Sequence, residues 1–128
     1  MNGVVVDTSV WIDFFAGRSV PRLEESLAEG VVILPPLVVA ELVSGASSVR
    51  DQASVAALLR ELAVHETPLE HWIRVGGLRR KLAAHGVSVS TPDAHVAQCA
   101  LERSALLLAR DRVFPRIADH TALRLSTG

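Results

Sequence analysis

Short, wholly apolar segments alternate with longer amphipathic ones along this chain, and that alternation most constrains its fold. The runs at residues 3–6, 31–34 and 105–109 have the length and composition of buried strands. Weaker extended segments occur at 64–67 and 122–125. Strands separated by helices build a parallel sheet with right-handed crossovers. The sequence therefore predicts an α/β fold with a central, mainly parallel sheet.

Helix signals fill the intervals between these runs. We expect helices over residues 8–16, 21–29, 35–44, 49–63, 69–85, 91–103 and 111–119. Thr8 or Ser9 is expected to cap the first of them, and Thr91 the helix that opens with Thr91-Pro92-Asp93. No low-complexity segment or long linker interrupts the pattern, so residues 1–128 are expected to form a single domain.

The composition favours an aliphatic core in a soluble protein. Apolar residues make up 49% of the 128 residues, and the net charge of −1 gives no hint of a nucleic-acid partner. Cys99 is the only cysteine, which excludes an intrachain disulfide and a thiolate zinc cluster and fits a reducing cytosol. Residues 1–17 lack a basic leader, and no apolar run reaches membrane-spanning length. We expect a soluble, cytoplasmic protein.

Asp7 is the residue that says most about function. It directly follows the run Val4-Val5-Val6, and a charge at the tip of a buried strand is costly unless something compensates it. Glu41, Asp93 and Asp111 occupy comparable places beside apolar segments. Because the carboxyl ends of parallel strands share one edge of a sheet, Asp7 and Asp111 should converge there. Convergence of Glu41 and Asp93 is compatible with the topology but not forced by it.

Four neighbouring carboxylates repel one another, and a hard divalent cation is the usual remedy. Mg²⁺ and Mn²⁺ prefer carboxylate and water oxygens and need no His or Cys ligand. Such ions can activate a water molecule and neutralise a phosphodiester during its hydrolysis. Hydrolysis of a nucleic-acid backbone is the reaction that this set of residues serves best.

Each acid also has a structural interpretation. Asp7, Asp93 and Asp111 lie at the starts of predicted helices, where acids commonly serve as caps. Glu41 lies in an otherwise apolar helix, where it either marks a surface stripe or belongs to a polar site. The sequence leaves both interpretations open.

Four short motifs follow one another in a characteristic order. They are Asp7-Thr8-Ser9-Val10-Trp11-Ile12-Asp13, Ala40-Glu41-Leu42, Thr91-Pro92-Asp93-Ala94 and Ala109-Arg110-Asp111-Arg112-Val113-Phe114. Together they resemble the motifs of PIN domains, and the length and order match the VapC-type toxins of toxin–antitoxin pairs. The resemblance covers essentially the whole chain and implies a PIN-like, three-layer α/β/α fold.

The resemblance also implies a site and a chemistry. In that family the matching acids, here Asp7, Glu41, Asp93 and Asp111, form the Mg²⁺ or Mn²⁺ site of an endoribonuclease. The hydroxyl residue after the first Asp orients water or metal, a role that falls here to Ser9 or Thr8. The products of such an enzyme carry 5′-phosphate and 3′-hydroxyl ends.

Two departures from the family pattern concern residues near the acids. The last motif often reads Asp-x-Asp-Phe, so Val113 stands where a further acid, and a potential ligand of a second metal, would be. His95 and Gln98, which follow the third acid, are interpreted as positions on a helix surface. The five histidines, His65, His71, His85, His95 and His120, show no metal-ligand spacing.

Substrate and partners are implied less directly. Aromatics are only 4% of the chain, so recognition of RNA by base stacking has little support and a structured target such as tRNA or rRNA is expected. Arg110 or Arg112 could meet a phosphate near the acids. Arg79-Arg80-Lys81 and Arg116 are the other dense basic groups, and each of these charges could equally be solvated surface.

The first predicted helix has more apolar residues than one core-facing side can hold. Trp11, Ile12, Phe14 and Phe15 cannot all face the core, so surplus apolar surface is expected there. The family resemblance implies two uses for it, a homodimer contact and a groove gripped by a VapB-type antitoxin.

Two other classes of function compete with a nuclease. A phospho-accepting signalling domain also places an Asp after a parallel strand, but it needs paired acids early and a Lys late, and Lys81 is the only lysine. A catalytically inactive PIN-like binding module is the other alternative. The presence of all four acids argues against an inactive module, whereas Val113, in place of a further acid, argues for one.

Overall fold

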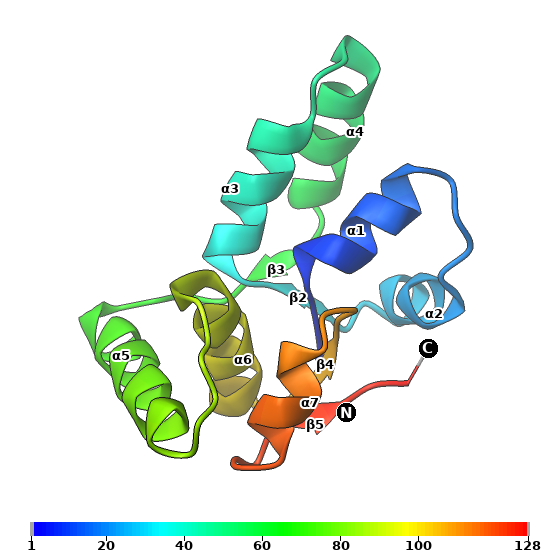
Figure 1. The fold of residues 1–128 in the computed structure, drawn as a ribbon. Helices are drawn as coiled ribbons and strands as arrows, with labels where there is room; N and C mark the ends of the chain where they lie inside the picture. Colours follow the sequence, from blue (N-terminus) through cyan, green and yellow to red (C-terminus); the bar gives the residue numbers. More distant parts are fainter. Residues whose placement is uncertain (1, 128) are drawn as a thin grey trace.

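The computed structural model describes residues 2–127, and its centre is a five-stranded sheet (Figure 1). The strands are β1 (Val4–Val6), β2 (Val32–Leu34), β3 (Ala63–Val64), β4 (Leu106–Leu108) and β5 (Arg124–Leu125). They lie in the order β3-β2-β1-β4-β5, and every neighbouring pair is parallel. The strand order therefore reverses between β1 and β4, the place where ligands bind in such sheets.

Helices cover both faces of the sheet. Within residues 2–127 they are α1 (Thr8–Phe15), α2 (Pro21–Glu29), α3 (Pro36–Gly45), α4 (Val49–Leu59), α5 (Leu69–Ala84), α6 (Thr91–Arg103) and α7 (Val113–Ala118). Figure 1 shows α5 and α6 on one side of the sheet and α1 and α2 on the other, with α3 and α4 extending away from it. The predicted three-layer α/β/α fold is confirmed, and the sheet is parallel throughout.

The central strands are apolar along their whole length because helices cover both of their faces. The three valines of β1 are completely buried, as is Leu107 in β4. The α6 helix is also buried on nearly all sides, with Ala94 through Ala100 each less than a tenth exposed. Asp93 lies on this helix and Asp7 follows β1, so both acids are attached to deeply buried parts of the fold.

Most predicted elements exist, but their ends differ. The α4 helix ends at Leu59 rather than at residue 63, because Ala63 already pairs with Ile33 of the sheet. The predicted strand at 64–67 is the two-residue β3, and the last strand is shorter than residues 122–125. Each of these shifts comes from sheet pairing, which local sequence does not encode.

Both predicted helix caps lie at a neighbouring residue. Asp7, not Thr8 or Ser9, occupies the N-cap position of α1. Ser90, not Thr91, caps α6, and its hydroxyl accepts a hydrogen bond from the Asp93 amide at 3.2 Å.

Within residues 2–127, no helix combines the length and the apolar character needed to cross a membrane.

Candidate active site

Asp7 directly follows β1 and is the N-cap residue of α1, but its carboxylate makes no capping hydrogen bond. The residue is 9% exposed, and its amide donates to the Leu108 carbonyl at 3.0 Å, which fixes the tip of β1 to the tip of β4. Its side chain makes no capping hydrogen bond to α1. Instead the Ser9 hydroxyl donates to Asp7 Oδ2 at 2.9 Å. Asp7 therefore occupies the N-cap position through its backbone, while its nearly buried carboxylate makes no capping bond to α1.

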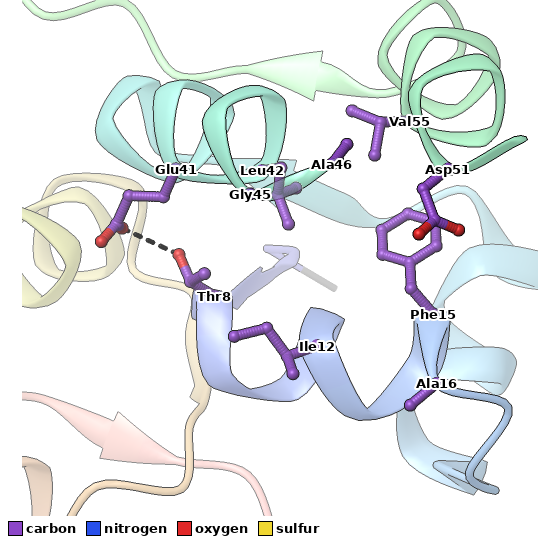
Figure 2. A pocket seen from close by; sticks show the side chains of 10 residues that line it. All are labelled: Thr8, Ile12, Phe15, Ala16, Glu41, Leu42, Gly45, Ala46, Asp51 and Val55. Atoms are coloured by element: carbon purple, nitrogen blue, oxygen red, sulfur yellow. Dashed lines mark hydrogen bonds between the residues drawn. The ribbon is translucent and has the colours of Figure 1, made fainter. Parts of the chain in front are cut away.

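The two hydroxyl residues after Asp7 have different partners. Ser9 Oγ also accepts a hydrogen bond from the Arg110 amide at 3.4 Å, so it links the ends of β1 and β4. Thr8 donates instead to Glu41 Oε1 at 2.8 Å, as Figure 2 shows. Glu41 is exposed on α3, but this bond directs its carboxylate toward the start of α1. Its position is thus set by a contact with the first motif.

Asp93 lies in the first turn of α6, where the other acids affect it electrostatically. Burial raises the pKa of Asp93 above its ordinary value, and the negative charges of Asp7, Asp111 and Glu41 raise it further. A hydrogen bond with the Ser90 side chain opposes these effects. The four acids Asp7, Glu41, Asp93 and Asp111 thus share one region, which we call the acidic edge.

Asp111 follows β4 in an exposed loop and has two roles available to its two oxygens. Oδ1 accepts a hydrogen bond from the Val113 amide at 2.9 Å, which shapes the start of α7. Through Oδ1, Asp111 therefore does act at the start of a helix, as one of the two interpretations expected. Oδ2 remains available to the acidic edge. Val113 itself brings no polar side chain to this place, as the sequence indicates.

In the described part of the chain, the charges of the acidic edge lack protein counter-ions. Among residues 2–127, no Lys or Arg nitrogen lies within 4.0 Å of a carboxylate oxygen of these four acids. Carboxylate and hydroxyl oxygens are the ligands of hard cations, so the donor set fits Mg²⁺ or Mn²⁺.

The predicted basic residues divide into structural and exposed ones. Arg79 donates to the Val89 carbonyl at 2.8 Å and Arg116 to the Gly86 carbonyl at 3.3 Å, so both secure the segment before α6. Arg110 lies beside Asp13, with Nε 3.4 Å from Oδ2, and its side chain is 44% exposed. Sequence reasoning missed this partner of Arg110, although Asp13 belongs to the first motif.

The interpretation of His95 and Gln98 as helix-surface positions is wrong. His95 is completely buried and Gln98 is 9% exposed, because α6 is packed on nearly all sides. His71 is buried as well, and Trp72 stacks on the His95 ring with centroids 4.7 Å apart. The run of small and apolar residues around His95 was the available signal that this helix has no free face.

A comparison with protein-family models matches residues 4–120 to the PIN domain. This match spans most of the chain, which therefore belongs to the PIN domain family. A search of curated protein sequences finds no match. The family assignment agrees with the motifs and with the strand order described above.

Solved structures of toxin–antitoxin complexes have the same fold. The DNA-bound VapBC complex of Salmonella typhimurium matches with a TM-score of 0.81 and 24% identity over 98% of both chains. VapBC2 of Rickettsia felis, bound to a promoter DNA fragment, matches with a TM-score of 0.79 and 22% identity over 96% of both chains. VapBC-1 of nontypeable Haemophilus influenzae gives 0.75 and 20% over 96% of both chains. At these identities the likeness establishes the fold.

Proposed function

We propose that this PIN domain is a metal-dependent endoribonuclease and the toxin of a VapBC-type pair. The observation that carries the proposal is the acidic edge, where four carboxylates with no Lys or Arg partner among residues 2–127 lie near the reversal of the strand order. Membership of the PIN family and the fold shared with VapBC complexes support it. The expected substrate is a structured RNA, and the expected setting is the cytoplasm.

The residues of the acidic edge would have different roles in metal binding and catalysis. Asp7 and Asp93, which are attached to the buried sheet and to α6, would hold Mg²⁺ or Mn²⁺, and Glu41 and Asp111 would complete the site from its exposed side. The bound ion would supply an activated water and a Lewis acid for the phosphodiester. Ser9 holds Oδ2 of Asp7 by hydrogen bonding and so fixes the plane of that carboxylate.

Cleavage of a tRNA mixture tests the catalytic part of this proposal. We expect cleavage with Mg²⁺ or Mn²⁺, none with excess chelator, and a loss of more than about 100-fold in Asp7→Asn, because a direct ligand should matter more than an outer-shell partner. Asp119→Asn is the matched control, since Asp119 is exposed at the end of α7. An Asp7→Asn variant that cleaves at the full rate would sink the proposal.

The inactive binding module predicts a different result. Calorimetry of the wild type with Mn²⁺ then shows no saturable binding, and no RNA is cleaved with either metal. Saturable binding that Asp7→Asn abolishes, while Asp119→Asn retains it, supports the nuclease instead.

A groove beside the acidic edge supports the antitoxin part of the proposal. It lies between α1, α3 and α4, has a volume of about 400 Å³, and is drawn in Figure 2. Its lining consists of Thr8, Ile12, Phe15, Ala16, Glu41, Leu42, Gly45, Ala46, Asp51 and Val55. Ile12 is 58% exposed, which agrees with the surplus apolar surface expected on the first helix.

An amphipathic antitoxin segment fits the chemistry of this groove. The wall is mainly apolar, while Glu41 and Asp51 are the acids that border it. A helix with an apolar face and a basic residue would bury Ile12 and meet these charges. Because Glu41 belongs to both the groove and the acidic edge, such a segment would also block catalysis.

The test is co-purification with the product of the adjacent short reading frame, and loss of cleavage in the complex. A homodimer remains a prediction.

A further inference from the structure

A buried polar network lies between β3, α5 and α6, and the proposed chemistry does not use it. Its members, which we call the histidine network, are His65, His71, His95 and Glu102. Glu102 Oε1 lies 2.8 Å from His65 Nε2 and 2.9 Å from His71 Nδ1. His71 Nε2 lies 2.7 Å from His95 Nδ1. The network ends at His95 Nε2, which is 3.4 Å from the Leu37 amide.

The Leu37 amide determines the direction of the hydrogen bonds that run from Leu37 through His95 and His71 to Glu102. A backbone N–H can only donate, so His95 Nε2 must accept and the proton of the neutral ring must lie on Nδ1. His95 Nδ1–H then donates to His71 Nε2, which places the proton of His71 on its Nδ1. That N–H finally donates to the carboxylate of Glu102.

Leu37 needs such an acceptor because of its place in α3. The first N–H groups of a helix have no partner within the helix. The N-cap of α3 is Pro35, which offers no capping side chain, and Pro36 has no N–H. Leu37 is therefore the first donor of the helix, and His95 supplies the acceptor that a capping Ser or Asp usually provides.

The same contact connects two residues of the acidic edge. Leu37 lies one helical turn before Glu41 on α3, and His95 lies two residues after Asp93 on α6. We propose that His95 is a tertiary N-cap of α3, held as an acceptor by His71 and Glu102, and that it positions Glu41 relative to Asp93. The positioning role rests on the proposed function, whereas the capping role does not.

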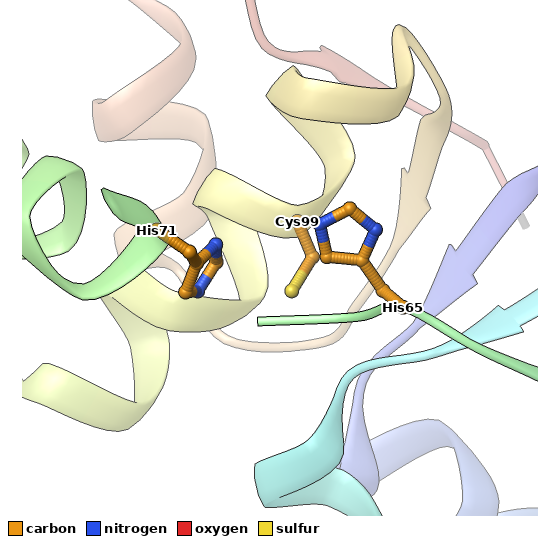
Figure 3. Close-up of side chains that lie close together, drawn as sticks. All are labelled: His65, His71 and Cys99. Carbon is orange, nitrogen blue, oxygen red and sulfur yellow. The ribbon is translucent and has the colours of Figure 1, made fainter. Parts of the chain in front are cut away.

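A metal site is the competing interpretation of these side chains. Figure 3 shows His65 and His71 on either side of Cys99, and one potential ligand atom of each lies within 4.8 Å of the others. However, both ring nitrogens of His71 are engaged, and burial raises the pKa of the Cys99 thiol to about 12. A metal on His71 would have to break the chain of hydrogen bonds that ends at Leu37. The hydrogen-bonded interpretation gives each ring nitrogen of His71 and His95 a partner.

Nitrogen NMR of the wild-type protein tests the capping role directly. We expect protonated Nδ1 and unprotonated Nε2 for both His71 and His95, with scalar couplings across the bonds from Leu37 N to His95 Nε2 and from His95 Nδ1 to His71 Nε2. A proton on His95 Nε2 would overturn the proposal. Shifts of the ring nitrogens of His65 and His71 on addition of one equivalent of Zn²⁺ would overturn it too, in favour of a metal site.

Calorimetry with Mn²⁺ tests the positioning role. His95→Phe keeps a ring for Trp72 to stack on but loses the acceptor, so we expect its Mn²⁺ affinity to fall about tenfold, as for outer-shell partners. His95→Gln restores an acceptor and should recover most of the affinity. His120→Phe is the matched control, because His120 stacks on His85 and not on a ring of the histidine network. Equal affinity in His95→Phe and the wild type would overturn the positioning role.

These measurements separate the two proposals. If the wild type binds Mn²⁺ but cleaves no RNA, the proposed function fails, while the affinities still decide the positioning role. If His95→Phe is unfolded, the NMR experiment on the wild type still decides whether His95 caps α3.

Discussion

The acidic edge and the histidine network differ in how the negative charge of their carboxylates is compensated. At the acidic edge, Asp93 is partly buried beside three other acids, and its pKa is raised by burial and by their charges. In the histidine network, burial alone would raise the pKa of Glu102, but hydrogen bonds from His65, His71, Gln98 and Arg74 lower it to about 2. The first region stores repulsion that a cation would relieve, and the second satisfies its one carboxylate with protein donors. Functional sites commonly contain such repulsive contacts, which lower the free energy of unfolding.

Removing Glu102 should show the largest difference between the two regions. Glu102→Ala leaves the buried His71 and His65 without their acceptor, so we expect a loss of about 3 kcal/mol in the free energy of unfolding. Urea unfolding at pH 7 measures it. Glu61→Ala, at an exposed position, is the control and should stay within about 0.5 kcal/mol of the wild type. Equal stability of both variants would mean that the network contributes nothing to the fold.

The low pKa of Glu102 also makes a prediction about acid unfolding. Because its pKa in the folded state is about 2, below the ordinary 4.5, its contribution is fully present above pH 4.5 and is lost as the pH falls toward 2. Allowing for partial exposure, we expect this loss to amount to about 2 kcal/mol. Glu102→Gln should flatten the stability profile in this pH range. A profile with the same slope in Glu102→Gln and the wild type would contradict the assignment.

The sequence predicted the acidic edge better than the histidine network, for a physical reason. Asp7 and Asp111 follow parallel strands, so topology alone brings them together, and the motifs indicated Glu41 and Asp93. Apart from Gln98, one turn earlier on α6, the partners of Glu102 lie on α5 and after β3, so only packing brings them near and local sequence carries little signal of them. The helix caps were missed by one residue for a related reason, since Ser90 and Thr91 both carry a suitable hydroxyl and only the backbone distinguishes them.

Ile12 tests whether the acidic edge, unlike the closed network, faces a partner. It is 58% exposed in the groove that Glu41 borders. We expect Ile12→Asp to weaken binding of the antitoxin by tens of fold, about 2 kcal/mol, because it places a charge in an apolar contact. The free energy of unfolding should change little. Ile73→Asp, at a 64% exposed position on α5, is the control. Equal weakening by both variants would show that the groove is not the specific contact.

Neutralising Asp93 should give the smallest effect on stability, but with the opposite sign to Glu102. The raised pKa means that the folded state disfavours the charge, so stability is gained as Asp93 takes up a proton on acidification. With chelator present, Asp93→Asn should therefore raise the free energy of unfolding by about 0.5 kcal/mol, the low end for relief of surface charge repulsion. With Mn²⁺ the order should reverse, because only the wild type can bind the ion fully and be stabilised by it. Thermal unfolding of both proteins in the two conditions measures this. A destabilised Asp93→Asn in chelator would mean that the acidic edge does not store repulsion, and the contrast between the two regions would disappear.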